Sequence, residues 1–73
     1  MDQNALLQTI GAQVRKHRKS KRLTQEVLAA RCGVFRTYLS RIESGTANPS
    51  VVVLSTLADA LAVDMGELFK STR

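Results

Sequence analysis

The sequence predicts an all-α domain of five short helices. Apolar residues recur at intervals of three and four along almost the whole chain, and no four-residue stretch alternates as a half-buried strand would. Residues that cap helices and glycines that end them separate these apolar segments. Seventy-three residues are enough for one core, so we expect a single domain over residues 1–73.

The first two expected helices have clear apolar stripes or end signals. The first covers about residues 4–21, with Asp2 or Asn4 as its N-cap, and its stripe consists of Leu7, Ile10 and Val14. The second begins after Thr24, a good N-cap, and ends at Gly33, which adopts the left-handed conformation at little cost.

The last three helices follow at short intervals. The third lies within residues 33–45 and ends at Gly45. Ser50 precedes the fourth, whose buried side should contain Leu54, Leu57, Ala58 and Leu61. The fifth should begin at Asp64, with Asp64 and Glu67 as a capping box and Val63 and Leu68 as a hydrophobic staple.

Composition narrows the class of protein. Eleven Lys and Arg against six Asp and Glu give a net charge of +5, which is typical of a protein that binds a polyanion. Cys32 is the only cysteine, so no internal disulfide can form and a reducing cytoplasm is the expected compartment. No apolar run approaches the length of a membrane span, and the N-terminus lacks the apolar stretch of a signal peptide.

The connection between the second and third helices is the most informative feature, because it predicts a helix-turn-helix at about residues 24–45. Only about three residues join the two helices, so they must cross steeply and their backbones must approach closely. Ala29 supplies a small side chain at the crossing, and Gly33 supplies the reversal. The inner side of the corner should be buried by Leu28, Val34, Leu39 and Ile42.

The outer face of the third helix is unusually polar and cationic. At about 100° per residue, one stripe contains Arg36, Thr37, Ser40, Arg41 and Ser44, whereas Phe35, Leu39 and Ile42 lie opposite. A solvated helix face usually mixes Glu, Lys and Gln, which have high helix propensity. Short hydrogen-bonding side chains and two arginines indicate a surface that contacts a ligand.

The stretch LTQEVLAARCGVFRTYLSRIESGTANPSVVVLSTLADAL resembles the helix-turn-helix domain of the phage-repressor (Cro/C1, XRE-type) family. The likeness covers about residues 8–69. It implies the compact five-helix fold of lambda-repressor-like domains and a homodimer that regulates transcription by binding double-stranded DNA at a two-fold-symmetric operator. Because the sequence ends soon after this stretch, it resembles stand-alone members, such as the controller proteins of restriction-modification systems, more than repressors with an added effector domain.

This resemblance also implies roles for individual residues. With the third helix in the major groove, Arg36, Thr37 and Arg41 would contact bases. Gln25 matches a glutamine that contacts the DNA backbone at the start of the second helix. Phosphate or mixed contacts would come from Tyr38, Ser40 and Ser44, and from Thr46, Asn48 and Ser50 around the turn before the fourth helix.

The basic run RKHRKSKR, residues 15–22, is expected to have two different sides. On a helical wheel His17, Arg18 and Lys21 continue the apolar stripe, whereas Arg15, Lys16 and Lys19 face away. In the resembled family the arginine at position 18 pairs with the glutamate at position 43, so we expect an Arg18–Glu43 ion pair. The outward residues would attract DNA at long range, and His17 would fill the edge of the core.

Three positions depart from the family pattern, and the first is His17, which replaces a common leucine. Phe35 replaces the Ser, Thr or Asp that would cap the third helix, at a cost of about 1 kcal/mol. It either packs inward or lies exposed beside the DNA, where it would contact a thymine methyl group. Arg22 replaces the glycine that usually ends the first helix, which puts the left-handed turn there in doubt.

Dimerisation is expected because one helix of this size reads too few base pairs to select a site in a genome. The candidate interface residues are Val52, Thr56, Val63, Met65, Leu68 and Phe69. At least one of Leu68 and Phe69 should complete the core instead.

Other function classes are weaker. Enzymatic activity has little support, because there is one histidine, no paired carboxylates, no metal-ligand cluster and no glycine-rich phosphate loop. An antitoxin-like or other protein-interaction module with the same fold is the main alternative, although antitoxins usually need an added segment. The three aromatic residues do not indicate RNA binding. No cofactor, small-molecule ligand or membrane partner is implied, whereas an activator would also contact RNA polymerase.

Overall fold

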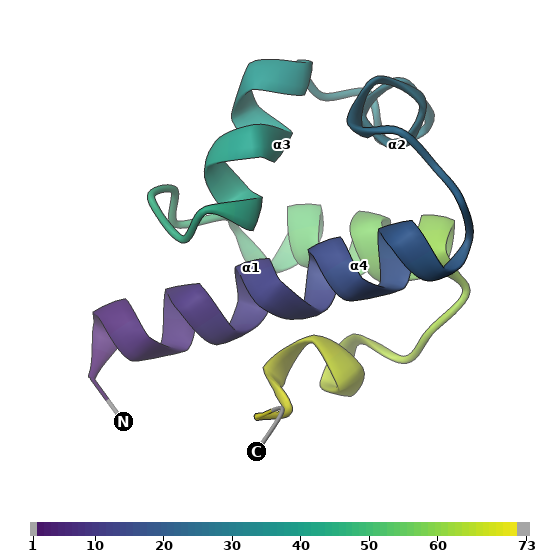
Figure 1. Cartoon of the computed structure of the whole chain (residues 1–73). Helices are drawn as coiled ribbons and strands as arrows, with labels where there is room; N and C mark the ends of the chain where they lie inside the picture. The colour runs from purple at the N-terminus through teal and green to yellow at the C-terminus, as the bar shows by residue number, and fades with distance from the viewer. Residues whose placement is uncertain (1, 72–73) are drawn as a thin grey trace.

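The computed structural model describes residues 2–71 as four α-helices and one short 3-10 helix, with no strand in that range (Figure 1). The elements are α1 (Gln3–Ser20), α2 (Gln25–Cys32), α3 (Arg36–Glu43), α4 (Val51–Leu61) and η1 (Met65–Phe69). The fold class is all-α as predicted, but the fifth predicted helix is a single short 3-10 segment. None of the helices in this part of the chain has the length and apolar character to cross a membrane.

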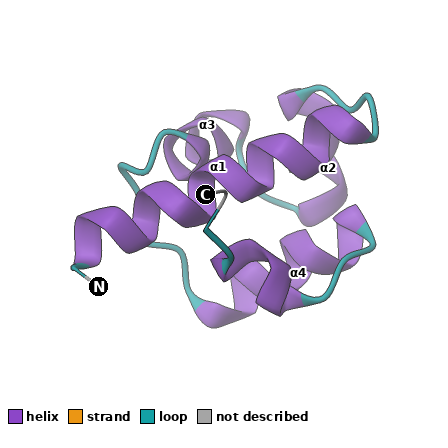
Figure 2. Ribbon diagram, turned by 60° about the horizontal axis from the view of Figure 1, so that its bottom comes forward, coloured by secondary structure: helices purple, strands orange, loops and turns teal. Residues whose placement is uncertain are grey.

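The helices pack around α1, the longest element. It contacts α3 on one side and η1 on the other, whereas α2 packs against both α3 and α4. Figure 1 shows α2 and α3 on the same side of α1, with η1 on the opposite side, and Figure 2 shows η1 beside α4. The helix-turn-helix therefore rests on a base formed by α1 and α4.

One cluster of buried apolar side chains holds all five elements together. Burying each Leu, Ile or Val contributes about 1.5–3 kcal/mol. Leu6 and Leu7 are both partly buried, and Leu6 packs against the cluster although Leu7 is the one predicted in the apolar stripe of α1. The cluster consists of Ile10, Val14, Leu28, Ala29, Leu39, Ile42, Ala47, Leu54, Leu57, Ala58, Leu61 and Leu68.

Side-chain caps and glycines define most helix ends as predicted. Asp2 accepts a hydrogen bond from the Ala5 amide at 2.7 Å, so it is the N-cap of α1. Thr24 and Ser50 cap α2 and α4 in the same way, each at 3.1 Å. Gly33 and Gly45 both have positive φ, at 69° and 78°, after α2 and α3.

The predicted capping box at the fifth helix is wrong. Asp64 is the N-cap of η1 but its side chain makes no capping hydrogen bond. Glu67 instead forms an ion pair with Lys70, and hydrogen bonding to Lys70 lowers the pKa of the Glu67 carboxyl. The carboxylate therefore points toward the end of η1 rather than back to its start.

The end of α1 also differs from the prediction. The helix stops at Ser20, so Lys21 leaves the helical path and is exposed instead of continuing the apolar stripe. Arg22 then adopts the left-handed conformation with φ of 57°, so the turn forms without the usual glycine. Ala62 does the same after α4, also at 57°. Both residues hold a conformation that costs a non-glycine residue about 1–2 kcal/mol.

Replacing Arg22 by glycine should therefore stabilise the protein by about 0.5–1 kcal/mol, because relief of the left-handed strain exceeds the entropy that glycine loses on folding. Urea unfolding followed by circular dichroism measures the change. Lys21→Gly is the matched control, since it removes the same charge at a residue with φ of −95° and should not stabilise. Equal effects of the two substitutions would contradict the explanation.

Candidate nucleic-acid interface

The corner between α2 and α3 is built as the sequence predicts for a helix-turn-helix. Ala29 is buried at the crossing, and its carbonyl accepts a hydrogen bond from the Val34 amide at 3.0 Å. Gly33 makes the reversal between the helices. Leu28, Leu39 and Ile42 are buried on the inner side and Val34 is half-buried, so the opposite side of α3 faces outward.

The outward face of α3 carries the three residues predicted to contact bases. Arg36, Thr37 and Arg41 are all exposed. Ser44 is also exposed and Ser40 is half-buried, whereas the ring of Tyr38 packs partly against the core. The structure thus presents a continuous polar and cationic strip along the whole length of α3.

Phe35 lies at the start of this strip and is 84% exposed, which decides between its two expected placements. It makes no side-chain cap, so α3 begins without one, as predicted. The ring packs against neither the core nor the helix end. A large apolar side chain therefore stands in solvent next to Arg36.

The other end of α3 is tied to the following loop. Arg41 donates from Nη2 to the Thr46 carbonyl at 3.1 Å, which uses one of its five N–H donors. The hydroxyls of Ser44 and Thr46 lie 2.9 Å apart, and each also donates to the Arg41 carbonyl. Asn48 is exposed, and Ser50 remains the cap of α4. These contacts hold Arg41 and the loop in one arrangement.

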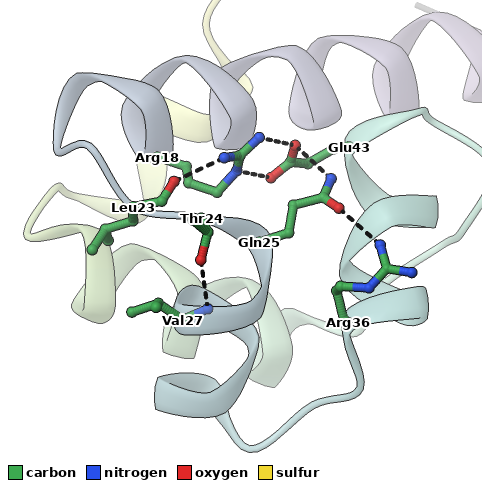
Figure 3. Close-up of polar contacts among 7 residues, drawn as sticks. All are labelled: Arg18, Leu23, Thr24, Gln25, Val27, Arg36 and Glu43. Atoms are coloured by element: carbon green, nitrogen blue, oxygen red, sulfur yellow. Dashed lines mark hydrogen bonds and ion pairs between the residues drawn. The ribbon is translucent and has the colours of Figure 1, made fainter.

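The ion pair predicted between Arg18 and Glu43 is present and joins α1 to α3 (Figure 3). Arg18 donates from Nε to Oε2 at 2.7 Å and from Nη2 to Oε1 at 3.0 Å, and a third donor reaches the Leu23 carbonyl at 2.8 Å. The Glu43 side chain is only 4% exposed. Hydrogen bonding to Glu43 raises the pKa of Arg18 further above its already high value, so the guanidinium stays charged.

Gln25 makes two contacts that sequence reasoning missed. Its Nε2 donates to Oε1 of Glu43 at 3.1 Å, and its Oε1 accepts from Nη1 of Arg36 at 3.4 Å (Figure 3). Gln25 and Arg36 are the first residues of α2 and α3, and a steep crossing brings these two helix starts together. The position of both residues at helix starts, together with the expected steep crossing, is the signal from which the Gln25–Arg36 contact could have been predicted.

An open hollow beside Gln25 has a cationic lining. The cationic residues of the lining are Arg18, Arg22 and Arg36, and the others are Leu23, Thr24, Gln25 and the acidic Glu26. The amides and dipole at a helix N-terminus favour an anion in the same place. Arg18 is already paired with Glu43, and the remaining charges, Arg22 and Arg36 against Glu26, leave the hollow net cationic and so suited to a phosphate group.

The six candidate dimer residues fall into three groups. Val52 and Phe69 are 74% and 40% exposed, so they are accessible to a second chain. Val63 and Met65 are half-buried against the core, and Thr56 donates its hydroxyl to the Val52 carbonyl at 3.0 Å. Leu68 is completely buried, so its assignment to the interface is wrong; it completes the core under α1 and α4.

The cysteine and the histidine, the residue types most often used in catalysis or metal binding, are both half-buried. Cys32 is half-buried, and desolvation raises the pKa of its thiol, which keeps it protonated at neutral pH. His17 is half-buried. Across residues 2–71, no group of three His, Cys, Asp or Glu side chains is placed to hold a metal ion.

Comparisons with known proteins agree with this geometry. The family model described as Helix-turn-helix (HTH_3) matches residues 14–68. An uncharacterized HTH-type transcriptional regulator of Sinorhizobium fredii, y4dJ, is 43% identical over 63 residues, which are 86% of this chain and 82% of that protein. The control protein C.MunI of a Mycoplasma species is 42% identical over 60 residues, 81% of each chain.

A solved structure gives the same result. The crystal structure of the restriction-modification controller protein C.AhdI from Aeromonas hydrophila is similar with a TM-score of 0.85 and 40% identity, covering 89% of this chain and 98% of that one. The chain belongs to the HTH_3 (XRE-type) family of helix-turn-helix, DNA-binding transcriptional regulators.

Proposed function

We propose that this protein regulates transcription as a homodimer that binds a two-fold-symmetric operator, with α3 of each protomer in the major groove. The observation that carries the proposal is the exposed polar strip of α3, which is backed along its length by buried Leu39 and Ile42. An α-helix fits the major groove, and its exposed side chains then reach base edges. The net charge of +5 favours association with DNA.

Arg36, Thr37 and Arg41 are the proposed base-contacting residues. An arginine can donate two hydrogen bonds to O6 and N7 of guanine, and the methyl group of Thr37 can rest on a thymine methyl. Phe35 extends the apolar part of this surface at the N-terminal end of α3. Together they would recognise a short run of base pairs in each half-site.

The DNA backbone would be held on both sides of α3. Gln25 and the cationic hollow at the start of α2 suit one phosphate. The loop that connects α3 to α4 suits a second, with Tyr38 and Ser40 contributing from α3. The loop residues proposed for this contact are Ser44, Thr46, Asn48 and Ser50. These contacts would fix the register of α3 without reading sequence.

The dimer would use the exposed apolar residues of α4 and the C-terminal segment. Val52 and Phe69 are the central candidates, with Thr56, Val63 and Met65 at their edges. Two protomers would then place their α3 helices about one helical turn of DNA apart. Similarity to C.MunI and C.AhdI supports a role as a controller of the same kind.

Selection of bound duplexes from a random DNA pool tests this function. The experiment uses the full chain at physiological salt with competitor DNA, because charge alone gives non-specific binding. The expected result is a two-fold-symmetric motif with half-sites about one helical turn apart. Weak, steeply salt-dependent binding with no motif would overturn the proposal and direct attention to a protein-interaction module.

Replacing Arg36 by alanine should weaken binding to the selected operator by about 1–3 kcal/mol and relax the preference at one base pair per half-site. Fluorescence anisotropy with the operator and with singly substituted duplexes measures both effects. Arg15→Ala is the control, because Arg15 is an exposed arginine of α1 outside the proposed interface and should weaken all duplexes slightly and alike. A uniform loss for Arg36→Ala would assign Arg36 to a phosphate.

A further inference from the structure

A continuous set of hydrogen bonds joins the buried ion pair to the exposed face of α3. Oε1 of Glu43 accepts from Arg18 at 3.0 Å and from Nε2 of Gln25 at 3.1 Å. Oε1 of Gln25 then accepts from Nη1 of Arg36 at 3.4 Å. We call these four residues the polar network (Figure 3). It starts at a carboxylate that is 4% exposed and ends at an exposed arginine proposed to contact a base.

The chemistry of its members gives the network a direction. An ionised carboxylate only accepts hydrogen bonds, and a guanidinium only donates them, whereas an amide has one end of each kind. The NH₂ group of Gln25 must therefore face Glu43, and its oxygen must face Arg36. The reverse orientation would put oxygen against carboxylate and NH₂ against guanidinium. The charge of Glu43 strengthens its hydrogen bond to Gln25 and so fixes the amide.

We infer that Glu43 is a positioning residue for Arg36 and acts through the Gln25 amide. The inference rests on the proposed function, in which Arg36 contacts a base. The ion pair that fastens α1 to α3 would then have a second role: it holds the acceptor that restrains the Arg36 guanidinium before DNA arrives. Sequence preference at one base pair would depend on a carboxylate that does not reach the DNA.

The expected effect follows from side-chain entropy. Arg36 is exposed, and without an acceptor from Gln25 it would rotate freely in the unbound protein. Ordering one long side chain at an interface weakens binding by a factor of about 3–10. This weakening applies only to a duplex that contains the base pair contacted by Arg36, because Arg36 becomes ordered only there. A duplex in which that base pair is changed is bound as tightly as before. Discrimination at that base pair should therefore fall by about the same factor.

Two variants of the full chain break the network at different points. Glu43→Gln keeps the shape of the side chain but can donate as well as accept, which lets the Gln25 amide turn over. Gln25→Leu removes the acceptor without changing any charge. Dissociation constants are measured for the selected operator and for two altered duplexes. In the first altered duplex, the changed base pair is the one at which Arg36→Ala relaxes the sequence preference. In the second, it is the base pair at which Arg41→Ala does so.

Discrimination should fall about 3–10-fold at the Arg36 base pair in both variants and stay unchanged at the Arg41 base pair. Gln25→Leu also loses a proposed phosphate contact, but that loss is the same for all three duplexes and leaves the ratios unaffected. In an Arg36→Ala background neither variant should change discrimination further. If Glu43→Gln does not fold, Gln25→Leu decides alone, because Gln25 is only half-buried.

Three results would overturn the inference. Unchanged discrimination in both folded variants would give Glu43 and Gln25 purely structural roles. An equal fall at both base pairs would indicate a general displacement of α3. A wild-type protein that enriches no DNA motif would overturn the proposed function itself, which distinguishes that failure from the first two.

Discussion

Replacing Arg18 by methionine should lower the free energy of unfolding by about 3–5 kcal/mol. The change removes two hydrogen bonds to Glu43, of 2.7 and 3.0 Å, and one of 2.8 Å to the Leu23 carbonyl. The Glu43 carboxylate remains, almost completely shielded from water, with Gln25 as its one donor in the polar network. The total stability of a chain of this length is about 4–11 kcal/mol, so a large fraction would be lost.

Urea unfolding followed by circular dichroism measures this loss. Arg15→Met is the matched control, because Arg15 lies one turn earlier on α1, carries the same charge and is exposed. It should change the free energy of unfolding by no more than about 0.5 kcal/mol. Equal effects of the two substitutions would mean that the ion pair contributes no more than a solvated arginine does.

The features that could be predicted from sequence are those that neighbouring residues determine. The Thr24 hydroxyl caps α2 by accepting a hydrogen bond from the Val27 amide three residues later, and Gly33 ends that helix by its own backbone freedom. A helical wheel needs only the helical period, and it correctly placed Arg36, Thr37 and Arg41 on the outside of α3 and Leu39 on the inside. The exposed face of the candidate site was therefore predictable, whereas its role in reading bases remains a proposal.

Sequence reasoning missed features that depend on which of several partners a group takes, above all where the partner lies on another helix. Gln25 lies on α2, whereas Glu43 and Arg36 lie at opposite ends of α3, so only the expected crossing of the two helices, and no local rule, indicates that Gln25 contacts both. The failure of Glu67 to cap η1 depends on a competing contact with Lys70. The turn at Arg22 forms in a conformation that its side chain disfavours, closed by hydrogen bonds from the Arg22 and Leu23 amides to the carbonyls of Lys19 and Arg18 at 2.9 and 3.1 Å.

Gly11 is the clearest case of such a missed contact, and replacing it by alanine should lower the free energy of unfolding by about 3 kcal/mol. Gly11 is buried in the middle of α1 where that helix crosses the end of α3. An added Cβ would lie 2.4 Å from the Ile42 carbonyl oxygen and 2.6 Å from that of Glu43. Both are backbone atoms, so relief requires moving one helix away from the other.

That movement would also strain the ion pair two turns along α1, because Arg18 reaches Glu43 across the same helix contact. The better helix propensity of alanine, about 1 kcal/mol, only partly offsets the clash. Gly66→Ala is the matched control, since a Cβ there would meet no atom within 4 Å. Urea unfolding should show a large loss for Gly11→Ala and none for Gly66→Ala. A neutral Gly11→Ala would mean that α1 and α3 can separate without cost, and the close crossing would then not be what holds the helix-turn-helix on its base.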